Sequence, residues 1–225
     1  MKKFLSLGEW LRENPKTIWL SIPVLILGIL WYWINGDKES QTGGYGHLGL
    51  TFRLLHKHQG QSKLFLRISY WLFSQANHIG VGSGLPTVRL KMAQVVAQLG
   101  DLKQAKMDIE SAIKLCQQTK DISQAAYITA HLGRIKIKLG DLAGAKRDLE
   151  SSFRDLEKIL KKRSTMHHQI WMSTAEMGLS EWYFASGDKK QALLWAQKAA
   201  ARAQKQDLKT RMLDISNLIH EIEHG

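Results

Sequence analysis

The stretch 97–112 reads AQLGDLKQAKMDIESA, and residues 137–152 repeat it as IKLGDLAGAKRDLESS. A third version, ASGDKKQALLWAQKAA, occupies residues 185–200. The Gly-Asp pair, which first stands at Gly100-Asp101, returns after 40 and then after 47 residues. Sequence periods of this length are typical of helical units stacked side by side. The sequence therefore predicts an all-α array of repeats.

Small residues recur at fixed distances after each glycine. An alanine stands five residues after the glycine in every copy, and seven residues further on stands another alanine or a serine. Small side chains allow two helices to approach closely, and glycine ends a helix at little steric cost. Each copy is therefore predicted to be a helix, a Gly turn and a second helix. The small positions are Ala105, Ala145 and Ala192, followed by Ala112, Ser152 and Ala199.

This pattern resembles the tetratricopeptide repeat family. The family has a Leu-Gly or Leu-Ala pair in its first helix, here Leu132-Gly133 in the second copy, then the Gly-Asp turn and the alanines of the second helix. The resemblance covers about residues 86–201. It implies an α-solenoid of about three to four helical hairpins, and Leu208–His224 reads as a C-terminal capping helix. The repeat is longer than that of the family, and the extra residues of the last interval are expected near Lys158–Arg163.

An earlier unit is centred on Gly60, 40 residues before Gly100. Phe65 and Leu72 stand there at the positions that the other copies give to alanine. Residues 47–85 are therefore expected to form a degenerate helical repeat, ahead of the repeats and the capping helix in residues 86–225. A polar, glycine-containing linker is expected over residues 35–46.

Residues 17–34, TIWLSIPVLILGILWYWI, contain no charged side chain and carry aromatic residues near both ends. As a helix they would extend about 27 Å, close to the thickness of the hydrocarbon core of a bilayer. A cleaved signal peptide fits less well because no small-residue cleavage site follows. A buried helix of a soluble domain is rarely apolar on all sides. We expect a single transmembrane helix at 17–34, with a short N-terminal tail at 1–16.

The charges that flank the apolar run predict an orientation. Four basic residues precede the run, whereas the stretch that follows has one lysine and two acids. The positive-inside rule then predicts a cytoplasmic N-terminus and repeats in the periplasm, on a bacterial inner membrane. The same rule applied to a mitochondrial membrane would place the repeats in the intermembrane space.

The chain is strongly basic, with 32 Lys and Arg against 20 Asp and Glu and a formal net charge of +12. Such a surface could meet anionic lipid, nucleic acid or an acidic protein segment, or could simply be solvated. The single cysteine, Cys116, excludes an intramolecular disulfide and is expected to be a buried structural thiol.

The candidate binding site follows from the resemblance. In the tetratricopeptide family the first helix of each unit lines a concave groove that holds peptides, and the Gly-Asp turns align those inner positions with this chain. We expect a mixed basic and aromatic groove suited to an acidic or amphipathic segment. Its residues would be Lys91, Gln94 and Gln98, then Tyr127, His131, Arg134 and Lys138, then Met177, Glu181 and Phe184. The Lys and Asn pattern of chaperone-tail clamps is absent, because Leu90 and Gln94, then Ala130 and Arg134, stand there.

Three motifs could suggest other chemistry. His220–His224 reads H-E-x-x-H, a zinc-hydrolase motif, but it ends the sequence and no third ligand follows. Gly80–Gly84 is rich in glycine but lacks the Gly-Lys-Ser/Thr of a phosphate-binding loop. The neighbouring histidines at His56 and His58, or His167 and His168, do not converge on one helix face. We therefore expect no catalytic residues, no metal and no cofactor.

Together these features predict a single-pass, membrane-anchored scaffold or adaptor that binds partner proteins near the membrane. Assembly, translocation or quality control of membrane or envelope proteins would suit such a molecule. One alternative is a basic helical module that binds anionic lipid or nucleic acid. Another is a metal-dependent hydrolase that uses the C-terminal H-E-x-x-H motif.

Overall fold

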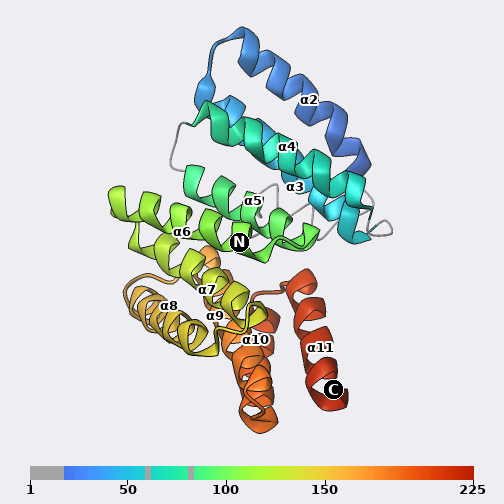
Figure 1. The fold of residues 1–225 in the computed structure, drawn as a ribbon. Helices are drawn as coiled ribbons and strands as arrows, with labels where there is room; N and C mark the ends of the chain where they lie inside the picture. The colour runs from blue at the N-terminus through green and yellow to red at the C-terminus, as the bar shows by residue number, and fades with distance from the viewer. Residues whose placement is uncertain (1–17, 59–61, 81–83) are drawn as a thin grey trace. The chain divides into compact units, whose positions relative to one another are not determined.

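The computed structural model describes residues 18–58, 62–80 and 84–225. These residues form ten α-helices and no strand (Figure 1), so the all-α prediction is confirmed for this part of the chain. The expected tail at 1–16 and the turn at Gly60 lie outside the described residues. The chain divides into two compact units, residues 1–108 and 109–225, and the division falls within helix α6 (Leu102–Gln118).

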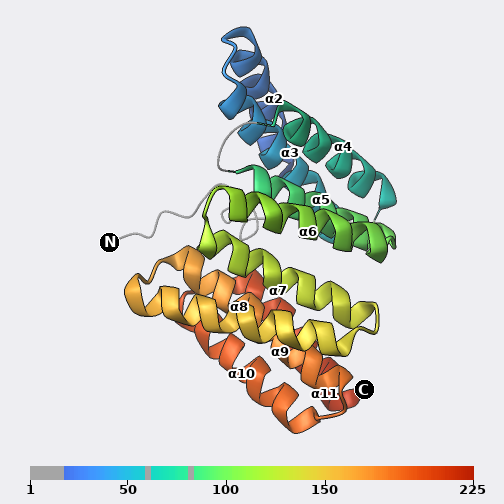
Figure 2. The same ribbon diagram turned by 60° about the vertical axis from the view of Figure 1, so that its left-hand side comes forward.

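The first unit holds the helices before α6. They are α2 (Ile18–Ile34), α3 (Lys38–His58), α4 (Lys63–Ile79) and α5 (Leu85–Leu99). Helices α3 and α4 lie side by side as a hairpin (Figure 2), and α5 packs on α4. Leu66, Phe73 and Val95 form the centre of one apolar cluster between these helices. Residues 47–85, the expected degenerate repeat, thus fall mainly in the α3–α4 hairpin.

Helix α3 can be approached closely because it is rich in glycine. A Cβ atom on Gly44 would lie 2.7 Å from the Ile29 side chain of α2, and one on Gly49 would lie 3.0 Å from the Phe73 ring of α4. The Ser69 hydroxyl also donates a hydrogen bond to the Gly49 carbonyl at 2.7 Å. The glycines therefore allow two neighbouring helices to pack directly against the backbone of α3.

The predicted transmembrane helix at 17–34 is wrong. Among the described residues, no helix combines the length and the apolar character that crossing a membrane requires. One side of helix α2 packs on the other helices of the first unit. Ile22, Leu25 and Ile29 of α2 join Leu48 of α3 and Leu72 of α4 in an apolar cluster. The predicted single-pass localisation, with periplasmic or intermembrane-space repeats, loses its basis with this helix.

The expected linker at residues 35–46 is also mostly helix. Only Asn35, Gly36 and Asp37 separate α2 from α3, which begins at Lys38. Gly36 has φ 69°, and the Asp37 carboxylate accepts hydrogen bonds from the backbone N–H and the hydroxyl of Ser40. These bonds lower the pKa of Asp37. A tight turn with its own N-terminal cap therefore replaces the flexible segment that the glycines suggested.

The second unit contains two complete hairpins and a final helix. Its helices are α7 (Ile122–Lys138), α8 (Leu142–Lys162), α9 (Met166–Ala185), α10 (Lys189–Lys205) and α11 (Lys209–His224). The small residues that recur in the sequence are all buried at the helix contacts, as predicted. Helix α11 covers the α9–α10 hairpin with Ile215, Leu218 and Ile222, which confirms the expected capping helix.

The longer interval between the last two Gly-Asp turns is accounted for by helix length. Helices α6 and α7 have 17 residues each, whereas α8 and α9 have 21 and 20. The segments that connect the helices are equally long in the two intervals, so the helices contain all seven additional residues. The extension at the C-terminal end of α8 coincides with the basic stretch Lys158–Arg163, as predicted.

Each Gly-Asp turn ends one helix and starts the next. Gly100, Gly140 and Gly187 have φ values of 105°, 81° and 86°, a left-handed conformation that favours glycine. The aspartate that follows accepts a hydrogen bond from a backbone N–H three residues later, as at Asp141 and Gly144 (2.8 Å). Asp121 caps α7 in the same way, although no glycine precedes it. The role of the glycine was predicted from the sequence, whereas this role of the aspartate was not.

Leu149 of α8 sits in a slot between two glycines of the neighbouring helices. A Cβ atom on Gly133 of α7 would lie 2.6 Å from the Leu149 side chain, and one on Gly178 of α9 would lie 2.4 Å from it. Leu149 is completely buried. Leu149 thus packs three helices of the second unit, α7, α8 and α9, against one another.

Candidate functional site

The predicted groove residues fall in both units, so each group is described with its own unit. Lys91, Gln94 and Gln98 lie on α5 of the first unit. The others lie on α7 and α9 of the second unit: Tyr127, His131, Arg134 and Lys138 on α7, and Met177, Glu181 and Phe184 on α9.

On α5 the predicted residues meet Arg53 of α3. The Arg53 guanidinium donates to the side-chain oxygens of Gln94 (2.6 Å) and Gln98 (3.1 Å). Lys91 Nζ also donates to the Gln94 oxygen, at 3.4 Å. Arg53 and Lys91 therefore share the side-chain oxygen of Gln94. Sequence reasoning missed Arg53 because it lies in the degenerate repeat, where the alignment to the Gly-Asp turns is weak.

A cavity of about 380 Å³ lies among α3, α4 and α5 within the first unit. Gly43, Gly46, Leu50, Phe73 and Val88 supply much of its apolar lining, while Glu39, His47 and Lys91 contribute ionisable side chains. Burial lowers the pKa of His47, so its ring is neutral near pH 7.

In the second unit, Arg134 of α7 and Glu181 of α9 form a two-pronged ion pair. The guanidinium donates through Nε at 2.7 Å and through Nη2 at 2.6 Å, one bond to each carboxylate oxygen. About a quarter of each side chain is exposed. Burial opposes the charge of Arg134, but Glu181 outweighs it, and the pKa of Arg134 is raised. The sequence predicted both residues for the groove without predicting that they neutralise one another.

An aromatic stack lies on the same two helices. The rings of Tyr127 (α7) and Trp171 (α9) are nearly parallel with centroids 5.1 Å apart, and His131 meets Tyr127 edge-on at 4.9 Å. His168 approaches Trp171 with centroids 5.5 Å apart. Trp171 was not predicted. Trp171 lies about two turns before Met177 on the first helix of the last repeat, and this spacing could have identified it as a further groove residue.

The remaining predicted residues differ in exposure. Met177 is 3% exposed, so it belongs to the core. Its sulfur accepts a hydrogen bond from the Arg211 guanidinium of α11 at 3.6 Å. Phe184 is partly buried and packs on the α9–α11 cluster. Lys138 is exposed at the end of α7. The surface that the structure assembles is therefore His131, Arg134 and Glu181 together with Trp171, around the Tyr127 ring, which is only 9% exposed; we call this group the α7–α9 face.

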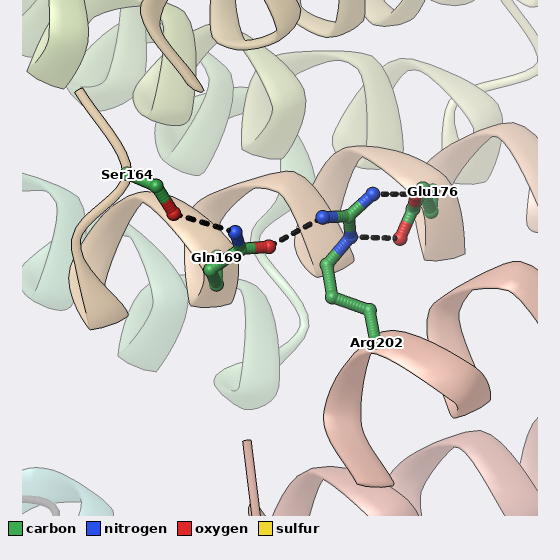
Figure 3. Close-up of polar contacts among 4 residues, drawn as sticks. All are labelled: Ser164, Gln169, Glu176 and Arg202. Carbon is green, nitrogen blue, oxygen red and sulfur yellow. Dashed lines mark hydrogen bonds and ion pairs between the residues drawn. The ribbon is translucent and has the colours of Figure 1, made fainter. Parts of the chain in front are cut away.

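A polar network that the sequence did not reveal joins α9 to α10 (Figure 3). Arg202 of α10 donates to both carboxylate oxygens of Glu176, at 2.9 and 2.8 Å, and also to the Gln169 oxygen. Gln169 donates in turn to the Ser164 hydroxyl at 2.8 Å. Glu176 is only 2% exposed, so this network clamps the hairpin internally.

The H-E-x-x-H motif lies in the last turns of α11. The rings of His220 and His224 have centroids 4.2 Å apart, and both residues are exposed. Within the described ranges, no three His, Cys, Asp or Glu side chains come together in a way that could hold a metal ion. Gly80 ends α4 in a left-handed conformation, and residues 81–83 of the glycine-rich motif lie outside the description.

These features define the class of the molecule as an all-helical protein built from successive helical hairpins. No protein-family model matches the sequence, and no curated protein matches it. Among solved structures, the chain is similar to BtubC (BKLC) from P. vanneervenii, with a TM-score of 0.63 and 14% sequence identity. That match covers 92% of this chain and 85% of BtubC. At this identity the similarity is one of fold.

Proposed function

We propose that this protein is a helical-repeat scaffold that binds a segment of a partner protein on the α7–α9 face. The observation that carries the proposal is that the first helices of two successive repeats hold a partly exposed Arg134–Glu181 ion pair and the partly exposed rings of His131 and Trp171 together. The resemblance of the repeats to the tetratricopeptide family supports the same assignment, because that family binds peptides with its first helices. Repeat folds of this kind present extended surfaces to partners.

The chemistry of the α7–α9 face indicates the kind of partner more closely than the basic composition of the whole chain does. Glu181 neutralises Arg134, so this face does not demand the acidic segment that Arg134 alone would favour. The pair instead offers a donor and an acceptor at a fixed distance, and the partly exposed Trp171 offers apolar ring surface. We infer a segment that combines an aromatic or aliphatic anchor with polar groups of mixed charge. Arg134→Gln together with Glu181→Gln removes both charges and the two-pronged pairing while keeping polar side chains at both positions.

Site-specific photocrosslinking tests the location. A photoreactive phenylalanine at position 131 of the full chain should capture a partner segment, whereas the same group at Arg147, exposed on α8, should not. The captured segment, synthesised as a labelled peptide, would then be titrated with the purified protein. We expect R134Q/E181Q to weaken its binding about tenfold, a change of ~1.4 kcal/mol.

The matched control removes an exposed ion pair elsewhere in the same unit. Lys161 and Glu157 lie 3.5 Å apart on α8, and their side chains are 73% and 48% exposed. K161Q/E157Q should leave the affinity unchanged. Equal affinities for R134Q/E181Q and the wild-type protein, or equal crosslinking from positions 131 and 147, would refute the assignment of the α7–α9 face.

A further inference from the structure

Helix α2 exposes large apolar side chains on the side that faces away from α3 and α4. Trp31 and Ile34 are 65% and 80% exposed, and Val24 and Leu27 are 68% and 66% exposed. Figures 1 and 2 show α2 at the N-terminal edge of this unit, beside α3. Terminal units of a repeat array normally present a polar outer side to water. We therefore expect another surface to cover the outer side of α2.

The exposed residues follow the spacing of a helix–helix seam. Val24, Leu27, Trp31 and Ile34 succeed one another at intervals of three, four and three residues, the pattern of a coiled-coil contact. A second stripe with the same spacing, Ile22, Leu25 and Ile29, already packs on α3 and α4. Helix α2 thus has two apolar stripes, one that is used within the chain and one that has the form of a contact with another helix. We call the exposed stripe the outer seam.

The area of the outer seam is large enough for a specific dimer. Given the exposed fractions of Val24, Leu27, Trp31 and Ile34, the seam presents roughly 550 Å² of apolar surface. Two copies packed on this seam would bury roughly 1,100 Å² in total, above the ~1,000 Å² that a specific interface requires.

The charge of the helix indicates which partner fits. Helix α2 contains no acidic or basic residue, so its outer side cannot select a partner by charge and suits another uncharged apolar helix. A second copy of α2 meets this condition, and a two-fold axis would place identical stripes against one another. We propose that the protein forms a homodimer in which the outer seam of α2 packs against the outer seam of a second copy.

The test measures the mass of the full chain in detergent-free buffer by sedimentation velocity over a range of concentrations. We expect a reversible dimer for the wild-type protein and a monomer for Leu27→Glu with Trp31→Glu. Both substitutions place charges in the seam and leave the buried stripe intact, and circular dichroism would check that the variant keeps its helix content. The matched control is Met107→Glu, which adds the same charge at a residue 61% exposed on α6 and should leave the dimer unchanged.

The results that overturn the proposal are distinct. A monomeric wild-type protein at all concentrations, or a dimer that L27E/W31E leaves intact, shows that the outer seam does not join two copies. Flotation with vesicles of phosphatidylcholine and phosphatidylglycerol provides a second arm. A monomer that floats with the vesicles, and loses this property in L27E/W31E, would show that lipid and not a second copy covers the seam.

Discussion

The ion pair between Arg202 and Glu176 makes a sharp prediction about stability. Replacing Arg202 with methionine removes both hydrogen bonds to a carboxylate that is 2% exposed. Methionine keeps much of the apolar stem, so the lost contact is chiefly the charged one. Removing one partner of a buried pair typically costs ~3–5 kcal/mol, because the other charge remains in a poorly solvated site.

The structure favours the lower part of that range. The Arg202 side chain is 25% exposed, so water can reach the vacated side of Glu176 and partly solvate it. We therefore expect a loss of about 3 kcal/mol in the free energy of unfolding, which for a chain of this size lowers Tm by roughly 6–12 °C. Urea unfolding followed by circular dichroism at 222 nm would measure the change as a lower midpoint with an unchanged slope.

Two further variants separate the physical causes. Glu176→Gln combined with Arg202→Met removes the stranded charge, so this double variant should be more stable than R202M alone. Arg154→Met removes an exposed partner of Glu150 at 4.0 Å and should cost less than about 0.5 kcal/mol. A loss below ~1 kcal/mol for R202M, or a double variant as unstable as the single one, would refute this reasoning about Glu176.

Three other perturbations test the repeats. Gly178→Ala should destabilise the second unit by about 1–3 kcal/mol, because its Cβ would lie 2.4 Å from Leu149, and Leu149→Ala should remove that penalty in a double-mutant cycle. Asp141→Ala should lower the stability by about 1 kcal/mol through loss of the bond to the Gly144 N–H, whereas Asp141→Asn should retain most of it in thermal unfolding. Burial, with a smaller contribution from Asp121, raises the pKa of Cys116 to about 11. Iodoacetamide at pH 8 should therefore leave the folded protein unmodified and react fully in 6 M guanidinium, and rapid modification of the native protein would contradict this burial.

The repeats could be predicted because their signals are local. Glycine in the left-handed conformation and an alanine at each close contact are requirements of single positions, and each copy meets them independently. The apolar run at 17–34 was misread for the opposite reason. An uncharged sequence shows that side chains leave water, but it does not show what they pack against. Ile22, Leu25 and Ile29 pack on α3 and α4, and the glycine at position 44 that allows this approach lies outside the run.

The candidate site was predictable only in part. Alignment to the turns placed Arg134, Glu181 and Tyr127 on the first helices, and the structure brings these three onto one side of the second unit. Their partnerships depend on the register between α7 and α9, which packing at Leu149 and the additional helix length determine. For that reason the pairing of Arg134 with Glu181 and the stack of Tyr127 on Trp171 could not be inferred from the sequence.

The Gly-Asp turns have a consequence for how this chain can evolve. Each turn carries its own signal to stop one helix and its own acid to begin the next, so neither depends on a distant residue. Duplication of the gene segment between two such turns would insert a unit whose helix ends are already specified. Unequal crossing-over at these codons can therefore lengthen or shorten the protein by whole hairpins.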